Sequence, residues 1–419
     1  MATKKQWYKL DNAGVLYSAL QREEYSAVYR FSAVMTEPVD PAALQKAIDA
    51  VLPRFPGFAV RIRRGVFWYY FEPNNAPGPS LKEDVADPCQ PFRFHEDAGW
   101  LIRFYRYENR ISFEAFHALS DGAGAIAFFR TLLAEYLPVG EGILNWPEPP
   151  RREELEDAYA RYAGPAARRL PLMKRAYQNL GQAEPFYTFH VTMGFVPLDK
   201  LREKARSYGV SVTEYLAAAL LWVLAEKQRR ENYHRMLPVT LAVPVNLRPW
   251  FPSETLRNFL VTVQPGFDPA LGEYRFAEVA AQVRHYMRLH ISPQEMRAQI
   301  TRNVRYQSNT ALQLLPRVVK NSIVAYHYRT RGVRPYSATF TNPGAIPVPE
   351  AMEPHIHHME VVLGQATVPR PHVASVSYGN IMEITVAGTQ ADAETERDFF
   401  RFLVREGLPV RIESNRSNP

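Results

Sequence analysis

Pairs of strand-like segments joined by tight turns constrain the fold of this chain most. Residues 99–107 and 110–116 are rich in apolar and aromatic side chains, and only Glu108-Asn109 separates them. Two strands joined so closely form an antiparallel hairpin, because a parallel pair needs a long crossover. A second such pair is 58–62 with 66–71, around a turn at Arg64-Gly65. The chain is therefore expected to contain antiparallel sheet.

Helical patterns alternate with these strands. Asp40 and Pro41 predict a helix start, as a cap and a first-turn proline, and residues 42–52 carry the helical pattern. Further helices are expected at 122–136, 199–207, 214–230 after Thr213, 276–289, 293–315 and 391–406. Further strands are expected at 24–35, 186–196, 240–245, 261–264, 337–341, 359–362, 373–378 and 381–387. This mixture predicts an α+β protein with two related-looking halves.

The length of 419 residues fits two domains of ordinary size. Residues 138–150 are rich in Pro, Gly and acidic side chains, as a connection would be. Residues 151–182 are rich in Arg and Ala and predict a bridging helical segment. We therefore expect an N-terminal half over 1–150, a linker over 151–185 and a C-terminal half over 186–419.

Cysteine content and hydropathy limit the compartment and the chemistry. Cys89 is the only cysteine, so the chain makes no internal disulfide and no multi-cysteine metal site. Cys89 lies between two prolines, away from the kind of setting that activates a thiolate, and we expect it to be structurally incidental. The first ten residues lack the apolar stretch of a secretory signal, and no window approaches 18 apolar residues. A cytoplasmic protein without a transmembrane segment is expected.

The net charge of +7 is unevenly spread. Ten Arg and Lys residues but only one acid, Glu295, lie between Arg284 and Arg334. This stretch is explained by a solvated basic face without a specific partner. Alternatively, it attracts an anionic substrate such as a CoA ester, docks an acidic carrier protein, or contacts an anionic membrane peripherally. Nucleic acid is not expected as a partner, because no recognised nucleic-acid module is present.

One short segment carries the strongest chemical signal. A predicted strand ends at His117, and Asp121 and Gly122 follow just before a predicted helix. A histidine at a strand end can project into a cleft, and its usual pKa near 6.5 suits a general base at neutral pH. From these residues alone, a core histidine followed by a simple Asp-Gly turn is the more common explanation of the pattern.

The string His-x-x-x-Asp-Gly at a strand-to-helix junction resembles the signature of the superfamily that includes chloramphenicol acetyltransferase, condensation domains and alcohol acyltransferases. Other segments resemble family elements in the same order: 49–56, 206–220, 242–249, 258–260 and 339–344. The chain is most similar to stand-alone bacterial alcohol acetyltransferase-type proteins. The resemblance implies two chloramphenicol acetyltransferase-like halves, each a mixed, mostly antiparallel sheet with flanking helices, around a central channel.

The resemblance also implies roles for individual residues. His117 matches the catalytic base, Asp121 the structural acid, and Arg248 the ion-pair partner of that acid. Gly122 matches a glycine that leaves room at the channel, while Asn342 and Ser120 match channel or oxyanion positions. Many members have a second histidine where this chain has Phe116, and the Asp-Phe-Gly-Trp-Gly element of plant enzymes is absent.

The activity implied by the resemblance is acyl transfer from an acyl-CoA thioester to an alcohol or amine, with His117 as base and no metal or other cofactor. An acyl donor bound to an acidic carrier protein is the first alternative. A non-catalytic member that binds a lipid or a partner protein is the second alternative, which the intact motif disfavours. The acyl donor and acceptor are the expected small-molecule partners, and a monomer is plausible.

Two other clusters could in principle bind a metal or a ligand. His355, His357 and His358 lie close together and could bind a metal, but no cysteine supports such a site. The aromatic run 67–71 could form a ligand site, but it is more typical of a strand with one buried face. We expect neither a metal site nor a ligand site at these clusters.

Overall fold

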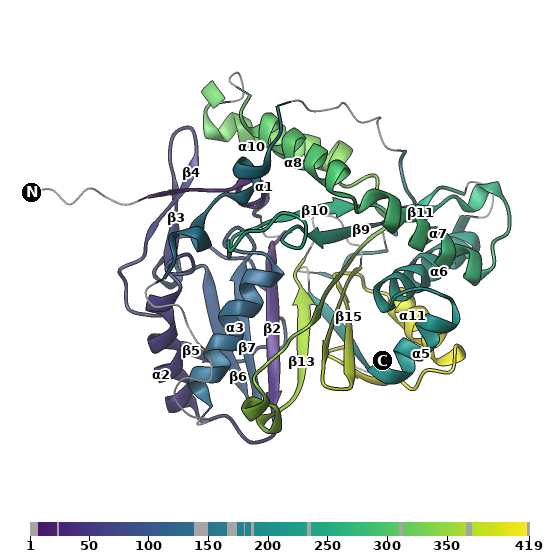
Figure 1. Ribbon diagram of the computed structural model, residues 1–419, viewed down its shortest axis with the longest axis horizontal. Helices are drawn as coiled ribbons and strands as arrows, with labels where there is room; N and C mark the ends of the chain where they lie inside the picture. The colour runs from purple at the N-terminus through teal and green to yellow at the C-terminus, as the bar shows by residue number, and fades with distance from the viewer. Residues whose placement is uncertain are drawn as a thin grey trace, which may run out of the picture.

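The computed structural model describes residues 7–22, 25–137, 150–165, 174–179, 181–185, 188–232, 236–309, 313–365 and 371–416. Two large sheets lie side by side, and helices cover their outer faces (Figure 1). One cluster of buried apolar side chains centres on the first sheet and includes a few residues of the second, and another cluster lies in the second sheet. The α+β class predicted from the sequence is confirmed.

The first sheet has five strands in the order β13-β2-β7-β6-β5. Its strands are β2 (Val28–Met35), β5 (Leu81–Glu83), β6 (Ile102–Tyr107), β7 (Arg110–Phe116) and β13 (Ile356–Leu363). The helices α2 (Pro41–Val51) and α3 (Gly122–Tyr136) pack against each other beside this sheet. The hairpin predicted around Glu108-Asn109 is the antiparallel pair β6–β7.

The second sheet has eight strands, in the order β10-β9-β12-β14-β15-β8-β16, with β11 paired to β9. Its strands are β8 (His190–Pro197), β9 (Val239–Asn246), β10 (Leu260–Val263), β11 (Gly266–Phe267), β12 (Ala338–Ala345), β14 (His372–Tyr378), β15 (Ile381–Gly388) and β16 (Arg411–Ser414). The helices around it are α5 (Leu198–Ser207), α6 (Val212–Asn232), α7 (Phe276–His290) and α11 (Glu394–Arg405). Strand β12 runs parallel to β9 and β14, and the other pairs are antiparallel.

One strand from late in the chain completes the first sheet. Strand β13 pairs antiparallel with β2, and Glu360 lies opposite Ser32. Its alternating apolar side chains enter the core of the first sheet rather than the second. The expected boundary at residue 186 therefore divides the sequence but does not separate the two sheets.

The bridging helical segment predicted over 151–182 is wrong for most of its described residues. Only the short helices η3 (Arg152–Leu155) and α4 (Ala158–Tyr162) form there. Residues 174–179 are held instead by tertiary hydrogen bonds, such as those from Ala176 N to Arg334 O and from Tyr177 N to Pro238 O. Contacts of this kind override the helix propensity of an Arg- and Ala-rich segment.

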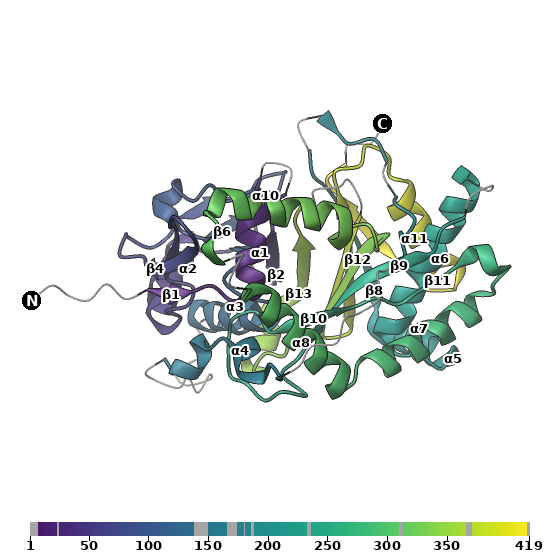
Figure 2. The same cartoon turned by 90° about the horizontal axis from the view of Figure 1, so that it is seen from above.

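Three helices lie across the region where the two sheets meet (Figures 1 and 2). They are α1 (Asn12–Leu20), α8 (Pro293–Gln307) and α10 (Arg317–His327). The helix predicted over 293–315 ends at Gln307. Helix α10 begins after Pro316, whose backbone has no N–H to donate a helical hydrogen bond. Helix α10 itself was not predicted from the sequence.

A small third sheet, β1-β4-β3, projects beside α10. Its strands are β1 (Tyr8–Lys9), β3 (Val60–Arg64) and β4 (Tyr69–Pro73). In the aromatic run 67–71, Tyr69 and Phe71 are buried and Phe67 is exposed. The run is therefore mainly a strand with a buried face, and it starts later than predicted. No single helix among the described residues is long and apolar enough to cross a membrane. Helices α5 and α6 reach that length and apolar content only together, and the pair is bent by 75°.

Candidate active site

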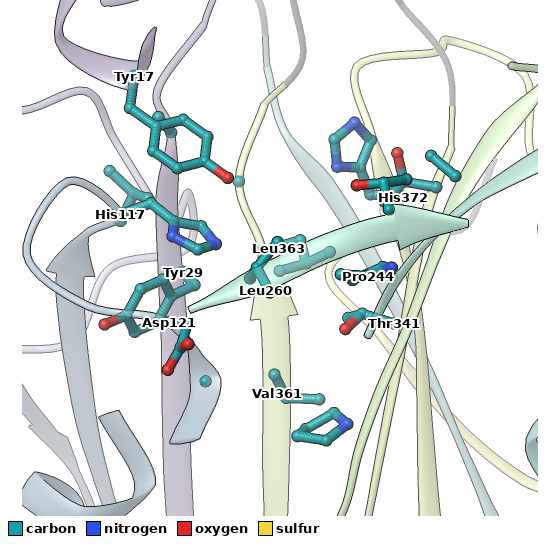
Figure 3. Close-up of a pocket in the computed structure, with 18 of the residues that line it drawn as sticks. Tyr17, Tyr29, His117, Asp121, Pro244, Leu260, Thr341, Val361, Leu363 and His372 are labelled. Atoms are coloured by element: carbon teal, nitrogen blue, oxygen red, sulfur yellow. The ribbon is translucent and has the colours of Figure 1, made fainter. Parts of the chain in front are cut away.

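His117 lies immediately after β7, and α3 begins five residues later at Gly122. Its backbone N donates a hydrogen bond of 2.8 Å to Ala27 O on the neighbouring segment. The strand-to-helix junction predicted from the sequence is confirmed. This junction fixes the backbone of His117 while its side chain faces a cavity between the sheets (Figure 3).

Two aromatic rings enclose the imidazole of His117. The ring of Tyr17 stacks on it at 4.5 Å between centroids, and Tyr29 meets it edge-on at 5.1 Å. Tyr17 comes from α1 and Tyr29 from β2, so separate elements hold the ring on two sides. The imidazole therefore has little freedom to rotate.

Asn258 determines which nitrogen of His117 carries the proton. The Asn258 Nδ2 group donates to the backbone O of His117 at 2.9 Å, which orients the amide. Its Oδ1 then faces His117 Nδ1 at 3.1 Å. An amide oxygen only accepts, so the neutral imidazole carries its hydrogen on Nδ1 and has its lone pair on Nε2.

Burial lowers the pKa of His117 from its usual value of 6.5. The negative charge of Asp121 and the hydrogen bond to Asn258 act in the opposite direction, but desolvation is the largest cause. The neutral imidazole, which can accept a proton, is therefore favoured at pH 7.

A cavity of about 650 Å³ lies beside this ring and is lined by both large sheets. Figure 3 shows His117, Tyr17, Tyr29 and Asp121 on one side. The facing wall carries Pro244, Leu260, Thr341, Val361, Leu363 and His372, mostly from the strands of the second sheet. The lining is largely apolar with a few polar groups, which is typical of a small-molecule site.

Asp121 and Arg248 form the ion pair expected from the sequence. Arg248 Nη1 donates to Asp121 Oδ2 at 2.8 Å, and Nη2 donates to Oδ1 at 3.2 Å. Asp121 also caps α3 by accepting from the N–H groups of Ala123 and Gly124, and it accepts from Phe259 N. Its carboxylate therefore joins the motif turn to the segment that carries Asn258.

Arg248 extends the same connection. Its guanidinium donates to the carbonyl oxygens of Thr255 and Arg257 at 2.8 Å each. These bonds hold the loop before β10, and Asn258 follows directly in that loop. The ion pair thus positions Asn258 against His117.

The motif glycine, Gly122, and the next glycine, Gly124, lie in different surroundings. Gly122 lines the cavity, but a Cβ there would only touch Pro343 at 3.7 Å, an ordinary contact. A Cβ on Gly124 would come closer than 3.0 Å to Leu256 O and to Ser120 Oγ. Close approach of the backbone therefore requires glycine at 124 rather than at 122.

Asn342 and Ser120, the two other residues expected at the channel, differ in their position relative to the cavity. Asn342 lines the cavity, and its amide is held by a bond from Nδ2 to Thr213 Oγ1 at 3.0 Å and one from Gly344 N to its Oδ1. Ser120 is fully buried and donates to Leu256 O at 2.7 Å. This bond ties the motif turn to the loop before β10, and Ser120 is not among the residues that line the cavity, so its channel or oxyanion role stays a prediction.

Sequence reasoning missed the roles of Asn258, Tyr17 and His372. Asn258 lay in a segment that resembled the family, but nothing in its local pattern marked a partner for His117. The contact spans 141 residues and depends on the loop that Arg248 holds. Tyr17 and His372 reach the cavity from α1 and β14, which no local motif connects.

Other titratable groups lie outside the site. Cys89 is buried, and burial raises the pKa of its thiol well above the usual range, which disfavours a thiolate nucleophile. His357 Nδ1 and His358 Nδ1 lie 2.6 Å apart, and His358 Nε2 lies 3.1 Å from Glu360 Oε1. Within the described ranges, no group of three or more His, Cys, Asp or Glu side chains is arranged to hold a metal ion.

Comparison with known proteins identifies the fold. No protein-family model matches this chain, and no curated protein matches its sequence. Solved structures do match along nearly the whole chain. Polyketide synthase associated protein 5 from Mycobacterium tuberculosis is 16% identical, with a TM-score of 0.61 over 94% of this chain and 96% of that chain.

Two further structures extend the comparison. The starter condensation domain of rhizomide synthetase, solved with C8-CoA, is 14% identical, with a TM-score of 0.61 over 96% of this chain and 95% of that chain. Trichothecene 15-O-acetyltransferase from Fusarium sporotrichioides is 11% identical, with a TM-score of 0.59 over 95% of this chain and 94% of that chain. The chain therefore has the fold shared by condensation domains and these acetyltransferases, as its motif indicated.

Proposed function

We propose that this protein is an acyltransferase that moves an acyl group from an acyl-CoA thioester to an alcohol or amine. The observation that carries the proposal is the state of His117: Asn258 holds its Nδ1, so Nε2 is the basic nitrogen beside the cavity. A neutral, immobilised histidine next to a cavity of about 650 Å³ is suited to general-base catalysis.

The chemistry follows from that arrangement. His117 Nε2 takes the proton of the acceptor hydroxyl or amine while the acceptor oxygen or nitrogen bonds to the thioester carbonyl carbon. The tetrahedral oxyanion that results needs a hydrogen-bond donor. Asn342, on the cavity wall, has a second amide hydrogen beyond the one given to Thr213. The C–S bond then breaks, and the proton on Nε2 passes to the leaving thiolate.

Two observations favour free acyl-CoA as the donor. A structure with this fold was solved with C8-CoA. The stretch 284–334 is strongly cationic and includes Asn303 and Val333 of the cavity wall, so a polyanionic donor would be attracted to this side of the site. The proposal assigns no resident metal or cofactor, because the thioester supplies the activated acyl group.

The test is thiol release from acetyl-CoA and longer acyl-CoAs in the presence of pooled alcohols or amines. Release should require both an acceptor and His117, and His117→Ala should lower the rate by at least 100-fold. The control is His95→Ala, because His95 is an exposed histidine that does not line the cavity, and this variant should keep wild-type activity.

Retained turnover in a folded His117→Ala variant would contradict the proposal. A reaction that proceeds only with an acyl group on an acidic carrier protein would replace free CoA as the donor and keep the role of His117. Binding of acyl-CoA without release in any pool would favour a non-catalytic lipid-binding role.

A further inference from the structure

The outward face of α10 is apolar. Val318 and Tyr326 are exposed, and their spacing of eight residues places both on one face of the helix, with Ser322 between them. Val319 beside them is also exposed. The opposite face of α10 packs toward α1 and the core of the first sheet.

The turn between β3 and β4 continues this apolar face. Arg317 N donates to Val66 O at 2.8 Å, and Lys320 Nζ donates to Phe67 O at 2.9 Å. Both Val66 and Phe67 are exposed. We call the combined area the α10 surface, formed by Val66, Phe67, Val318, Val319 and Tyr326. Contiguous exposed apolar side chains of this kind mark an interaction site.

In the segment of the chain that carries α10, every charged side chain is positive. Residues 296–349 contain eight Arg and Lys and no Asp or Glu. Arg317 directs its guanidinium to Gly65 O and Tyr69 OH, which are neutral acceptors. Among the described residues, no ion pair neutralises Arg64, Arg317 or Arg329, which lie at the turn, the start of α10 and just beyond its end.

We propose that the α10 surface docks on an anionic lipid bilayer. Exposed aliphatic and aromatic side chains can enter the interface between headgroups and acyl chains, and adjacent cations bind anionic headgroups. A CoA phosphate or an acidic carrier protein would match the cations but would leave the apolar side chains unused. The combination of both features therefore favours a membrane surface.

Docking in this orientation would place the cavity directly behind the bilayer-facing helix. The chain continues from α10 into a π-helical turn, Tyr328–Gly332, and both end residues line the cavity. Such π-helical turns are frequent at functional sites. The docking proposal does not rest on the proposed acyl transfer, because binding to vesicles requires no turnover.

The experiment is co-sedimentation of the full chain with vesicles of phosphatidylcholine alone or with one third phosphatidylglycerol. We expect at least tenfold tighter binding to the anionic vesicles. Binding should weaken in 0.5 M NaCl, because salt screens the headgroup attraction. Equal binding to both vesicle types, or no binding to either, would overturn the proposal.

Two variants locate the contact. Val318→Glu and Phe67→Glu should each lower binding to anionic vesicles by at least tenfold. Val404→Glu, on α11, is the matched control, because Val404 is 55% exposed and Val318 is 68% exposed. Thermal unfolding should confirm that all three variants are folded. Unchanged vesicle binding of Val318→Glu and Phe67→Glu would overturn the proposal. It would also be overturned if the protein bound an acidic acyl carrier protein more tightly than anionic vesicles and these two variants abolished that binding.

Discussion

The side-chain amide of Asn258 forms two hydrogen bonds with His117, one with the backbone oxygen of His117 and one with its imidazole ring. The amide donates to His117 O at 2.9 Å and accepts from Nδ1 at 3.1 Å. The first bond fixes the direction of the amide, and the second fixes the tautomer of the imidazole. One side chain therefore sets both the position and the proton state of the proposed base.

Replacing Asn258 with Leu should lower kcat while KM changes little. Leucine keeps the approximate volume but can neither orient the ring nor accept from Nδ1. We expect a loss of about 10- to 100-fold in kcat, part of the 10²–10⁴-fold that a positioned base contributes. Steady-state kinetics with saturating acyl-CoA checks this. A change confined to KM would mean that Asn258 acts on binding instead.

Asn258→Asp should move the acid limb of the pH–rate profile to higher pH. An aspartate can still accept from Nδ1, but its negative charge favours the imidazolium and raises the pKa of His117. The profile of kcat/KM against pH measures this shift. A merely structural role for Asn258 would lower the rate without moving the limb.

The wild-type pH profile has a definite expected sign. Burial lowers the pKa of His117 below 6.5, so the neutral base is the majority form at pH 6.5 and above. Activity should fall only as the pH drops through that lowered pKa and the ring becomes protonated. A plot of kcat/KM should therefore have an acid limb with an apparent pKa below 6.5. A limb clearly above 6.5 would contradict the assignment.

Asp121→Ala should destabilise the protein and reduce activity together. Removal of this carboxylate leaves Arg248 unpaired in a largely buried setting and removes the cap of α3. Breaking a buried pair from one side costs about 3–5 kcal/mol. The melting temperature and the rate of thiol release should both fall.

Asp40→Ala is the matched control for this change. Asp40 also caps a helix, accepting from the N–H groups of Ala42 and Ala43, but it is exposed and forms no ion pair with another described residue. Loss of an exposed cap costs about 1 kcal/mol. Equal destabilisation by Asp40→Ala and Asp121→Ala would mean that the pairing with Arg248 contributes little.

The sequence predicted the parts of the site that are local. His117 and Asp121 lie four residues apart on one strand-to-helix junction, so hydropathy and the motif were enough to place them. Arg248 could be paired with Asp121 only through the family resemblance. Asn258 could not be predicted as a partner of His117, because its position depends on a loop fixed by tertiary bonds from Arg248.

The fold was predictable to a similar degree. Strands with tight turns, such as β6 and β7, followed from pattern alone. The assignment of β13 to the first sheet did not, because an apolar strand does not reveal which sheet it joins. The segment 174–179 carried a helical composition, yet bonds to Arg334 and Pro238 hold it in an irregular conformation.

The two glycines near the motif should respond differently to alanine. Gly124→Ala places a methyl group closer than 3.0 Å to Leu256 O, a backbone atom that cannot move away without displacing the loop before Asn258. We expect a lower melting temperature and a lower rate. Gly122→Ala meets only Pro343 at 3.7 Å, so it should fold normally and narrow the cavity slightly. Melting curves and rates for acetyl- and octanoyl-CoA check both variants. A stable, fully active Gly124→Ala would show that the loop is not packed as closely as the structure places it.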